Sequence, residues 1–141
     1  DIAITTDVIA GFPGETPEDF AETLDVVRRV GFTRLHVFPY SERAGTPAVR
    51  LPDRVPKRER KERARQLRAL GRRLAADYRA RFVGATLDVL WMRQDGQTWY
   101  GLTDNYLAVK TTASAPLYNR LLPTRLIAVE RTHLVGEVLI D

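Results

Sequence analysis

The stretch Asp7-Val8-Ile9-Ala10-Gly11-Phe12-Pro13-Gly14-Glu15-Thr16-Pro17-Glu18-Asp19-Phe20 decides how the first part of this chain folds. An apolar run precedes Gly11 and Gly14, so a buried strand leads into a tight turn. Thr16 is suited to cap a helix, Asp19 completes a capping box, and Pro17 fits the first helical position. In α/β proteins such a strand–turn–helix element presents ligands at the carboxyl end of the strand, although it also serves as a plain connection.

The residues around this stretch predict a βαβ unit. Ile2–Ala10 is apolar almost throughout, which predicts a parallel strand buried on both of its faces. Apolar residues recur at helical spacing over Pro17–Val30, and Gly31 is suited to end that helix in a left-handed conformation. Thr33–Phe38 is the next predicted strand, so the two strands should run parallel on either side of the helix.

The middle of the chain is predicted to pass from a loop into a long basic helix. Several prolines and Gly45 make Pro39–Pro56 a loop of fixed shape. Lys57–Phe82 is the longest predicted helix, because apolar residues recur every three or four positions along it. Eleven Lys or Arg residues lie between Lys57 and Arg81, against three acids. Such a run is typical of a polyanion-binding surface, although a solvated helix face has the same composition.

Short β-type segments separated by turn residues make up the rest of the chain. They are residues 86–92, 98–101, 106–111, 121–129 and 134–140. Segments of this length and spacing predict a small antiparallel barrel of the OB type, with Trp91 and Trp99 in its core. We place the boundary near Gly84, which gives one domain over residues 1–82 and a second over residues 83–141.

The composition limits the classes of protein to which the chain can belong. It has 141 residues, 44% of them hydrophobic, so it can bury one core or two small ones. No apolar run is long enough to span a membrane, and no signal peptide is visible. Cysteine is absent, which excludes a disulfide scaffold and is compatible with a cytoplasmic origin. Because the chain starts at Asp1 inside a strand-like segment, we expect it to be a piece of a longer protein.

Two motifs carry a resemblance to a known family. The stretch from Asp7 reads D-x-I-x-G-F-P-G-E-T, and Leu35–Ala48 contains Tyr40-Ser41-Glu42-Arg43-Ala44-Gly45-Thr46. Together they resemble the end of a radical S-adenosylmethionine (SAM) domain, in particular that of the methylthiotransferases that modify tRNA. Gly101–Tyr106 and its flanking strands resemble the RNA-binding TRAM barrel of that family. The implied fold is α/β: the last βα units of a partial (β/α) barrel, a long basic helix, then an OB-like antiparallel β-barrel.

The resemblance also implies cofactors and the positions that face them. Family members use SAM and [4Fe-4S] clusters held by thiolates, so without cysteine the clusters would lie outside this chain, which alone would be inactive. Asp7 either pairs within the barrel or faces the cofactor, and His36 is expected to be structural. No catalytic residue and no metal ligand is predicted. The positions matching the cofactor-facing strand ends are Ile9, Gly11, Val37 and Phe38, of which the apolar three are also compatible with a core role.

The expected RNA contacts combine cations with aromatic side chains. Arg43 is placed to bind a phosphate or a substrate carboxylate, unless it forms a surface ion pair. On the basic helix, Arg65, Arg68, Arg72 and Arg79 are expected near solvent, with Arg68 and Arg72 as the principal contacts. The candidates on the barrel are Tyr100, Tyr106, Lys110, Tyr118, Arg120 and Arg125.

The resemblance implies the C-terminal part of a tRNA methylthiotransferase that converts an adenine C–H to C–S–CH3 beside the anticodon. Its partners would be the tRNA anticodon stem-loop and the N-terminal domains of the same polypeptide, with no membrane. His36–Ser41 and Gly101–Tyr106 favour the branch that acts on N6-threonylcarbamoyladenosine. The isopentenyladenosine branch is the close alternative, and a non-catalytic RNA-binding module is an answer of a different class.

Overall fold

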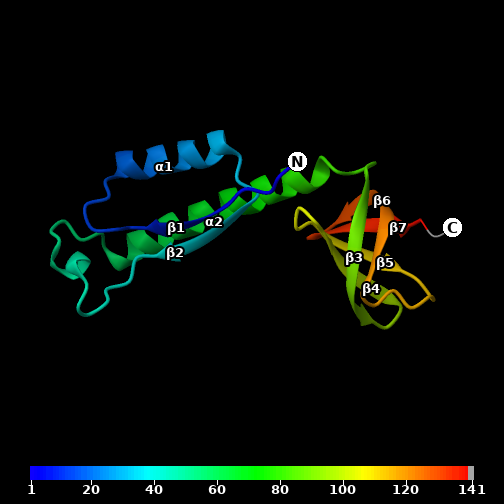
Figure 1. Cartoon of the computed structure of the whole chain (residues 1–141). Coiled ribbons are helices and arrows are strands. Elements are labelled where there is room, and N and C mark those ends of the chain that lie inside the picture. Colours follow the sequence, from blue (N-terminus) through cyan, green and yellow to red (C-terminus); the bar gives the residue numbers. More distant parts are fainter. Residues whose placement is uncertain (140–141) are drawn as a thin grey trace. The chain divides into compact units, whose positions relative to one another are not determined.

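The computed structural model describes residues 1–139, which divide into two compact units (Figure 1). The strand–helix unit comprises Ile4–Ala75, and the barrel unit comprises Asp1–Ala3 with the residues from Ala76 onward. Each unit has its own hydrophobic core. The division falls a few residues before the boundary expected from the sequence.

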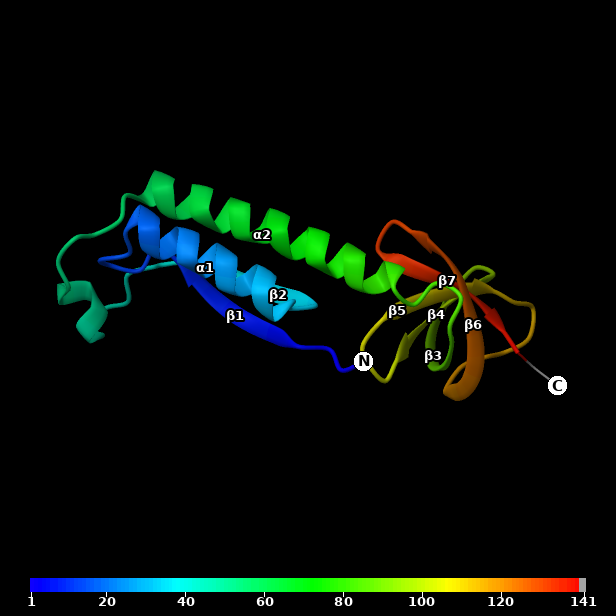
Figure 2. The same cartoon turned by 90° about the horizontal axis from the view of Figure 1, so that it is seen from above.

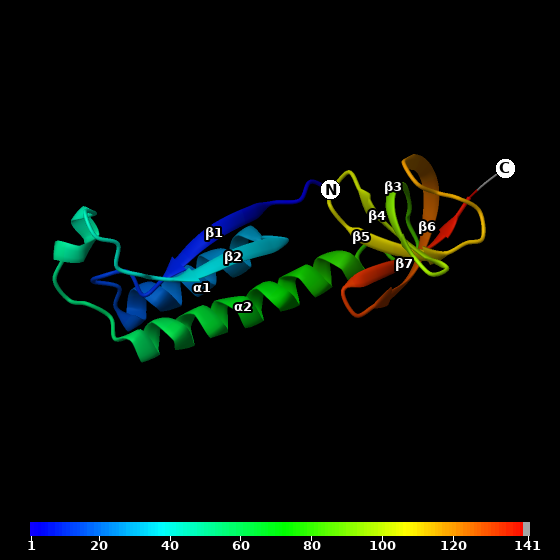
Figure 3. The same ribbon diagram turned by 90° about the horizontal axis from the view of Figure 1, so that it is seen from below.

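The strand–helix unit is built on a pair of parallel strands. β1 (Thr5–Ala10) pairs with β2 (Arg34–Pro39), and α1 (Pro17–Val30) connects them. The helix α2 (Lys57–Ala80) follows a loop that contains a 3-10 turn, η1 (Pro47–Arg50). In Figure 2 α1 lies in front of β2, and in Figure 3, seen from the opposite side, the strands lie in front of α1.

Both helices pack on the same face of the β1–β2 pair. The core between them combines strand residues such as Ala10 and Val37 with Phe20 of α1 and Leu67 of α2. The opposite face, here called the open face, is exposed at every position. It consists of Thr5, Asp7 and Ile9 on β1 and Arg34, His36 and Phe38 on β2.

The expectation of a strand buried on both faces was therefore wrong for the described residues. β1 pairs with β2 alone, its side chains alternate in burial, and residues 2–4 precede the strand. A single layer of helices covers one face of a two-stranded sheet, so alternate side chains stay in solvent. Ile9, for example, is 54% exposed.

The local signals around α1 are confirmed in detail. The Thr16 hydroxyl accepts from the Asp19 backbone N–H at 3.1 Å, and the Asp19 carboxylate accepts from the Thr16 N–H at 2.9 Å. This is the capping box that the spacing predicts. Gly31 ends the helix with φ 71° and ψ 45°, and its N–H donates to the Val27 carbonyl.

The long helix α2 buries the predicted apolar stripe and ends two residues earlier than expected, at Ala80. Leu67 and Leu70 belong to the core of the strand–helix unit, whereas Tyr78 belongs with Phe82 to the barrel core. Gly71 permits close packing, because a Cβ there would lie 3.3 Å from the Leu35 side chain.

The barrel unit is a closed five-stranded barrel with the order β3-β4-β5-β7-β6. Its strands are β3 (Thr86–Asp95), β4 (Thr98–Thr103), β5 (Ala108–Thr112), β6 (Arg120–Glu130) and β7 (His133–Val138). The pairing of β5 with β7 is parallel, which corrects the expectation of a wholly antiparallel barrel. A five-stranded Greek-key barrel of this kind agrees with the OB type. Of the last predicted strand, Ile140 lies outside the described residues.

Candidate functional site

The carboxyl ends of β1 and β2 place two of the predicted cofactor residues side by side. Ile9 and Phe38 are Cα partners on the open face and are 54% and 52% exposed. Apolar side chains held next to each other at the ends of parallel strands offer a flat surface to an apolar ring. Both side chains are therefore accessible to a ligand at this end of the open face.

Val37 points the other way. Its side chain is 8% exposed and packs in the core against the helices, so it does not share the open face with Phe38. Its backbone carbonyl accepts a hydrogen bond from Arg68 Nη2 at 3.0 Å. The alternation of side chains along a strand explains the separation of the two neighbours.

Gly11 is glycine for a reason that the sequence did not reveal. Its φ is 77°, and a Cβ at this position would lie 2.5 Å from Cγ of Arg60. The Gly11 N–H donates to the Glu15 carboxylate at 2.9 Å. The space on the Cβ side of Gly11 is therefore occupied by the Arg60 side chain.

Asp7 and His36 lie opposite each other on the open face. They are Cα partners in the parallel pair, both are exposed, and each is two residues before Ile9 or Phe38 on its strand. Among residues 1–139 Asp7 forms no ion pair, and its carboxylate is exposed on the open face.

Two arginines of α2 hold the loops that follow β1 and β2. Arg60 forms an ion pair with Glu42 at 2.7 Å, and Arg63 forms one with Glu15 at 2.6 Å and another with Glu59. The hydrogen bond from Arg60 lowers the pKa of Glu42 to about 2, with a further contribution from a backbone hydrogen bond. Glu15 is thus held by Arg63 as well as by the Gly11 N–H.

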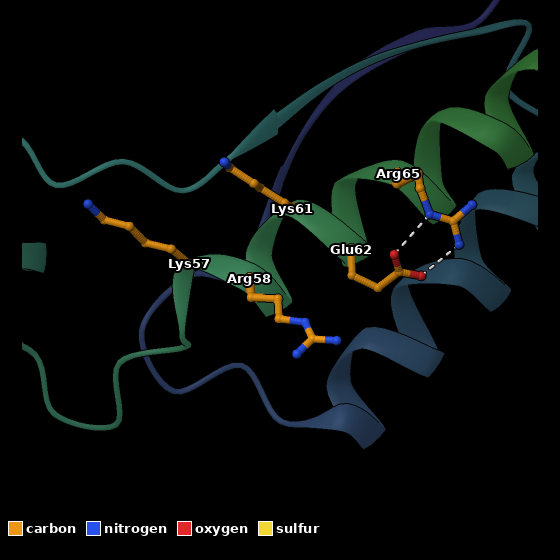
Figure 4. Close-up of a pocket in the computed structure, with 5 residues that line it drawn as sticks. All are labelled: Lys57, Arg58, Lys61, Glu62 and Arg65. Atoms are coloured by element: carbon orange, nitrogen blue, oxygen red, sulfur yellow. Dashed lines mark hydrogen bonds and ion pairs between the residues drawn. The ribbon is translucent and has the colours of Figure 1, made fainter.

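The remaining cations of α2 are more exposed. Lys57, Arg58, Lys61, Glu62 and Arg65 line a shallow pocket of about 530 Å³ at the start of the helix (Figure 4). Arg65 is held by Glu62 at 2.7 Å, whereas the two lysines and Arg58 form no ion pair among the described residues. This group is the free positive charge nearest to the strand-end loops along α2.

The α2 arginines named from the sequence differ from one another. Arg68 and Arg72 are exposed, although Arg68 also holds the Val37 carbonyl. Arg79 is only partly exposed, and its Nε is buried. Arg43, in the loop after β2, is exposed and forms no ion pair among residues 1–139.

On the barrel, a group of charged side chains and aromatic rings gathers from all five strands, β3 to β7. We call it the barrel cluster and define it as Arg93, Tyr100, Lys110, Glu130 and His133. The Arg93 guanidinium lies 4.2 Å from the centre of the Tyr100 ring, and the His133 ring lies edge-on to Tyr100 at 5.5 Å. Lys110 is the Cα partner of Tyr100 and pairs with Glu130 at 2.8 Å.

The barrel cluster is electropositive around its imidazole. Burial, then the charges of Lys110, Arg79 and Arg93, lower the pKa of His133 below its usual value of 6.5. Sequence reasoning named Tyr100 and Lys110 but missed Arg93 and His133. The alternation of residues along β3 and β7 was available, but their register against β4 and β5 was not.

The other barrel residues predicted to touch RNA are exposed but lie elsewhere. Arg120 and Arg125 belong to β6, which neighbours β3 and β7 and not β5. Tyr106, 80% exposed, lines an apolar depression with Leu90, Met92 and Leu121. Tyr118 is also exposed, at 72%. The structure therefore brings together only part of the predicted set.

The described residues contain neither a membrane-spanning helix nor a metal-binding group. None of the helices there is long and apolar enough to cross a membrane. In residues 1–139 no group of His, Asp and Glu side chains is arranged to hold a metal ion.

Comparison with known proteins gives relatives over nearly the whole chain. The chain is 37% identical over 98% of its length to a tRNA-2-methylthio-N(6)-dimethylallyladenosine synthase of Acetivibrio thermocellus. It is 36% identical over 89% of its length to a threonylcarbamoyladenosine tRNA methylthiotransferase of Bacillus subtilis. It is 50% identical over 67% of its length to a dimethylallyladenosine synthase of an Arthrobacter species. The chain spans 29%, 29% and 18% of the lengths of these relatives. No protein-family model matches it.

Proposed function

Because the chain belongs to the tRNA methylthiotransferase family, we propose that it is the C-terminal part of a radical SAM enzyme that modifies tRNA in the cytoplasm. The observation that carries the proposal is the open face of β1 and β2, with Ile9 and Phe38 at its carboxyl end. An exposed face of this kind on a parallel sheet suits the interior of a (β/α) barrel whose other strands lie outside this chain.

Within this proposal, Ile9 and Phe38 bind SAM through their side chains, and Val37 contributes at most its backbone. Asp7 and His36, on the same face, supply the polar contacts. The chemistry that the cofactors supply when bound is activation of an adenine C–H bond and delivery of sulfur. The clusters need thiolates from outside this chain, which has no cysteine.

The barrel cluster is the proposed contact with the anticodon stem-loop. Small barrels of the OB type bind single strands by stacking bases on aromatics and following phosphates with cations. Tyr100, beneath the Arg93 guanidinium and beside Lys110, offers both on the β4–β5 surface. Arg68, Arg72, Arg120 and Arg125 are secondary, because they lie outside this cluster.

The favoured substrate is N6-threonylcarbamoyladenosine, with Arg43 as the residue that recognises it. The threonylcarbamoyl group carries a carboxylate, and an exposed guanidinium pairs with a carboxylate in a bidentate manner. The second candidate is the dimethylallyl (isopentenyl) adenosine, favoured by the names of the 37% and 50% identical relatives. That substituent is apolar and would give Arg43 no partner.

Mass spectrometry of tRNA nucleosides from a strain that lacks the full-length gene tests the proposal. We expect loss of the 2-methylthio form of threonylcarbamoyladenosine, restored by the wild-type gene and by Arg28→Met, a control on the exposed side of α1. Arg43→Met should lower the product about tenfold, as expected for a lost charged hydrogen bond. Loss of the dimethylallyl product, with full restoration by Arg43→Met, would favour the second candidate.

The non-catalytic alternative makes a different prediction. If both 2-methylthio nucleosides persist in the deletion strain, and the full-length protein binds no iron, the chain is an RNA-binding module. RNA binding by the barrel cluster would then survive while the cofactor assignment falls.

A further inference from the structure

We propose that Arg60 is a positioning residue, which locks the turn after β1 to the loop after β2 and so sets the shape of the SAM-binding end of the open face. The proposal rests on the proposed function. It assigns a role in cofactor binding to a residue of the basic helix that does not reach RNA.

Arg60 uses its whole guanidinium on the strand-end loops. Nε donates to the Val55 carbonyl at 2.6 Å, Nη1 to the Tyr40 carbonyl at 3.2 Å, and Nη2 to the Glu42 carboxylate at 2.7 Å. The residue is 5% exposed although it lies in a run of exposed cations. A charge is retained at such a depth only when it is paired and hydrogen-bonded, and here each of the three guanidinium nitrogens has an acceptor.

The contact with Tyr40 leads directly to the cofactor surface. The Tyr40 N–H donates to the Ala10 carbonyl at 2.8 Å, so Arg60 and Ala10 hold the same residue from either side. Ala10 follows Ile9, and Tyr40 comes two residues after Phe38. The guanidinium also lies 5.1 Å from the Tyr40 ring, which packs edge-on to Phe12 at 5.3 Å.

Gly11 makes this arrangement possible. A Cβ there would meet Arg60 Cγ at 2.5 Å and Arg60 Cα at 3.1 Å, so the turn lies directly against the helix at this residue. The aliphatic part of Arg60 therefore packs under the first loop while its guanidinium holds the second. Lysine has one charged nitrogen and no planar fork, so it could not reach all three acceptors.

The test compares Arg60→Met and Arg60→Lys with the wild type in the full-length protein, with Arg65→Met as a matched control. Arg65 is exposed, and within residues 1–139 it pairs only with Glu62 on its own helix. Calorimetry of SAM binding should show about tenfold weaker affinity for Arg60→Met, as expected when buried acceptors lose a charged donor. Arg60→Lys should be intermediate, and Arg65→Met should bind as the wild type does.

Glu42→Ala provides a milder variant in case Arg60→Met fails to fold. It removes one contact of Arg60 and leaves the buried acceptors in place, so the protein should fold and bind SAM more weakly than the wild type. Unchanged SAM affinity in the folded Arg60 variants, or in Glu42→Ala if only that variant folds, would overturn the proposal.

A fall in thermal stability alone, with SAM affinity intact, would assign Arg60 to the fold and likewise overturn the proposal. A wild-type protein that binds no SAM would instead reject the proposed function, and this inference with it. The two failures are therefore distinguishable in the same experiment.

Discussion

Two buried arginines of the strand–helix unit and one surface arginine of the barrel unit are used in opposite ways. In the first, Arg60 and Arg63 are 5% and 4% exposed and spend their hydrogen bonds on carboxylates and carbonyls of the strand-end loops. In the second, the Arg93 guanidinium lies over an aromatic ring at a strand surface. A count of basic residues along the sequence treats the two alike. Only the second arrangement leaves positive charge available to a polyanion.

The units also differ in how their sheets are covered. The barrel closes on itself, so every strand has two neighbours and the tryptophans fill the interior. The β1–β2 pair has helices on one face and exposed apolar side chains on the other. An uncovered face with neighbouring apolar side chains at one end, here Ile9 and Phe38, is suited to bind a ligand, whereas a closed barrel must bind through its outward side chains.

The largest expected effect is a loss of stability in the barrel core that leaves the core of the strand–helix unit unchanged. Trp91→Ala should destabilise the barrel by about 4 kcal/mol, because it removes a fully buried indole and leaves a cavity. Hydrogen exchange should then speed up for amides of β3–β7, while β1, β2 and α1 keep their protection. Equal loss of protection in both units would mean that they fold as one cooperative body.

A smaller effect is expected from the ion pairs of the strand-end loops. Glu15→Ala leaves the Gly11 N–H without an acceptor and removes the carboxylate partner of Arg63 Nη1, which keeps only the carbonyl of residue 15. This should lower the free energy of unfolding by about 2 kcal/mol. The control is Glu18→Ala, in the exposed first turn of α1. It should lower the free energy of unfolding by only a few tenths of that amount. Denaturant unfolding, followed through the signal of the Gly11 amide, measures the loss of stability in both variants. Equal losses would show that Glu15 acts only as a surface charge.

Salt dependence of tRNA binding sharpens the contrast between buried and available cations. Arg93→Ala with Lys110→Ala should lower the slope of log K against log salt by roughly 1 for each lost phosphate contact. Arg120→Ala with Arg125→Ala, on β6, should change it less. Tyr100→Ala should weaken binding with little change in slope, because stacking releases no counterions. A larger effect from the β6 pair would move the interface to that strand.

Lowering the pH should produce the smallest changes in stability. The barrel unit should begin to lose stability at a higher pH than the strand–helix unit. The pKa of His133 is lowered in the folded state by burial and neighbouring cations, so protons bind the unfolded chain more readily. Stability therefore falls as pH drops below about 6.5, the usual value for histidine. His133→Gln should remove this dependence in a series of thermal melts.

Glu42, in the strand–helix unit, should affect stability at a lower pH than His133 does. The hydrogen bond from Arg60 lowers the pKa of Glu42 from 4.5 to about 2. The contribution of Glu42 to folding stability is therefore complete above pH 4.5 and is lost as the pH falls from 4.5 to about 2. An NMR titration that finds Glu42 ionising near 4.5 would show that the Arg60 pair does not persist in solution.

The signals read most reliably from the sequence were local ones. The capping box at Thr16 and Asp19, the left-handed end at Gly31 and the apolar stripe of α2 depend on residues three or four apart. Such interactions are formed within one element, so a single sequence contains all their partners. The five barrel strands were found for the same reason, with errors of one to three residues at most of their ends.

Three features of the sites depend on residues distant in the chain. Val37 separates from Phe38 because the helices cover one face only, and Gly11 is needed because Arg60, 49 positions later, packs against it. Arg93 and His133 both contact Tyr100 because of the strand register around the barrel. None of these partners can be identified from spacing, because register and packing are properties of the assembled sheet.

The sequence by itself therefore determined the order of elements, their caps and the family resemblance, because these are set by short-range patterns. The tertiary structure decided which side chains share a surface. It buried Arg60 and Arg63, exposed Ile9 and Phe38, and gathered the barrel cluster from five strands. The physical reason is that desolvation and stacking depend on contacts across the fold, which residue type and spacing leave open.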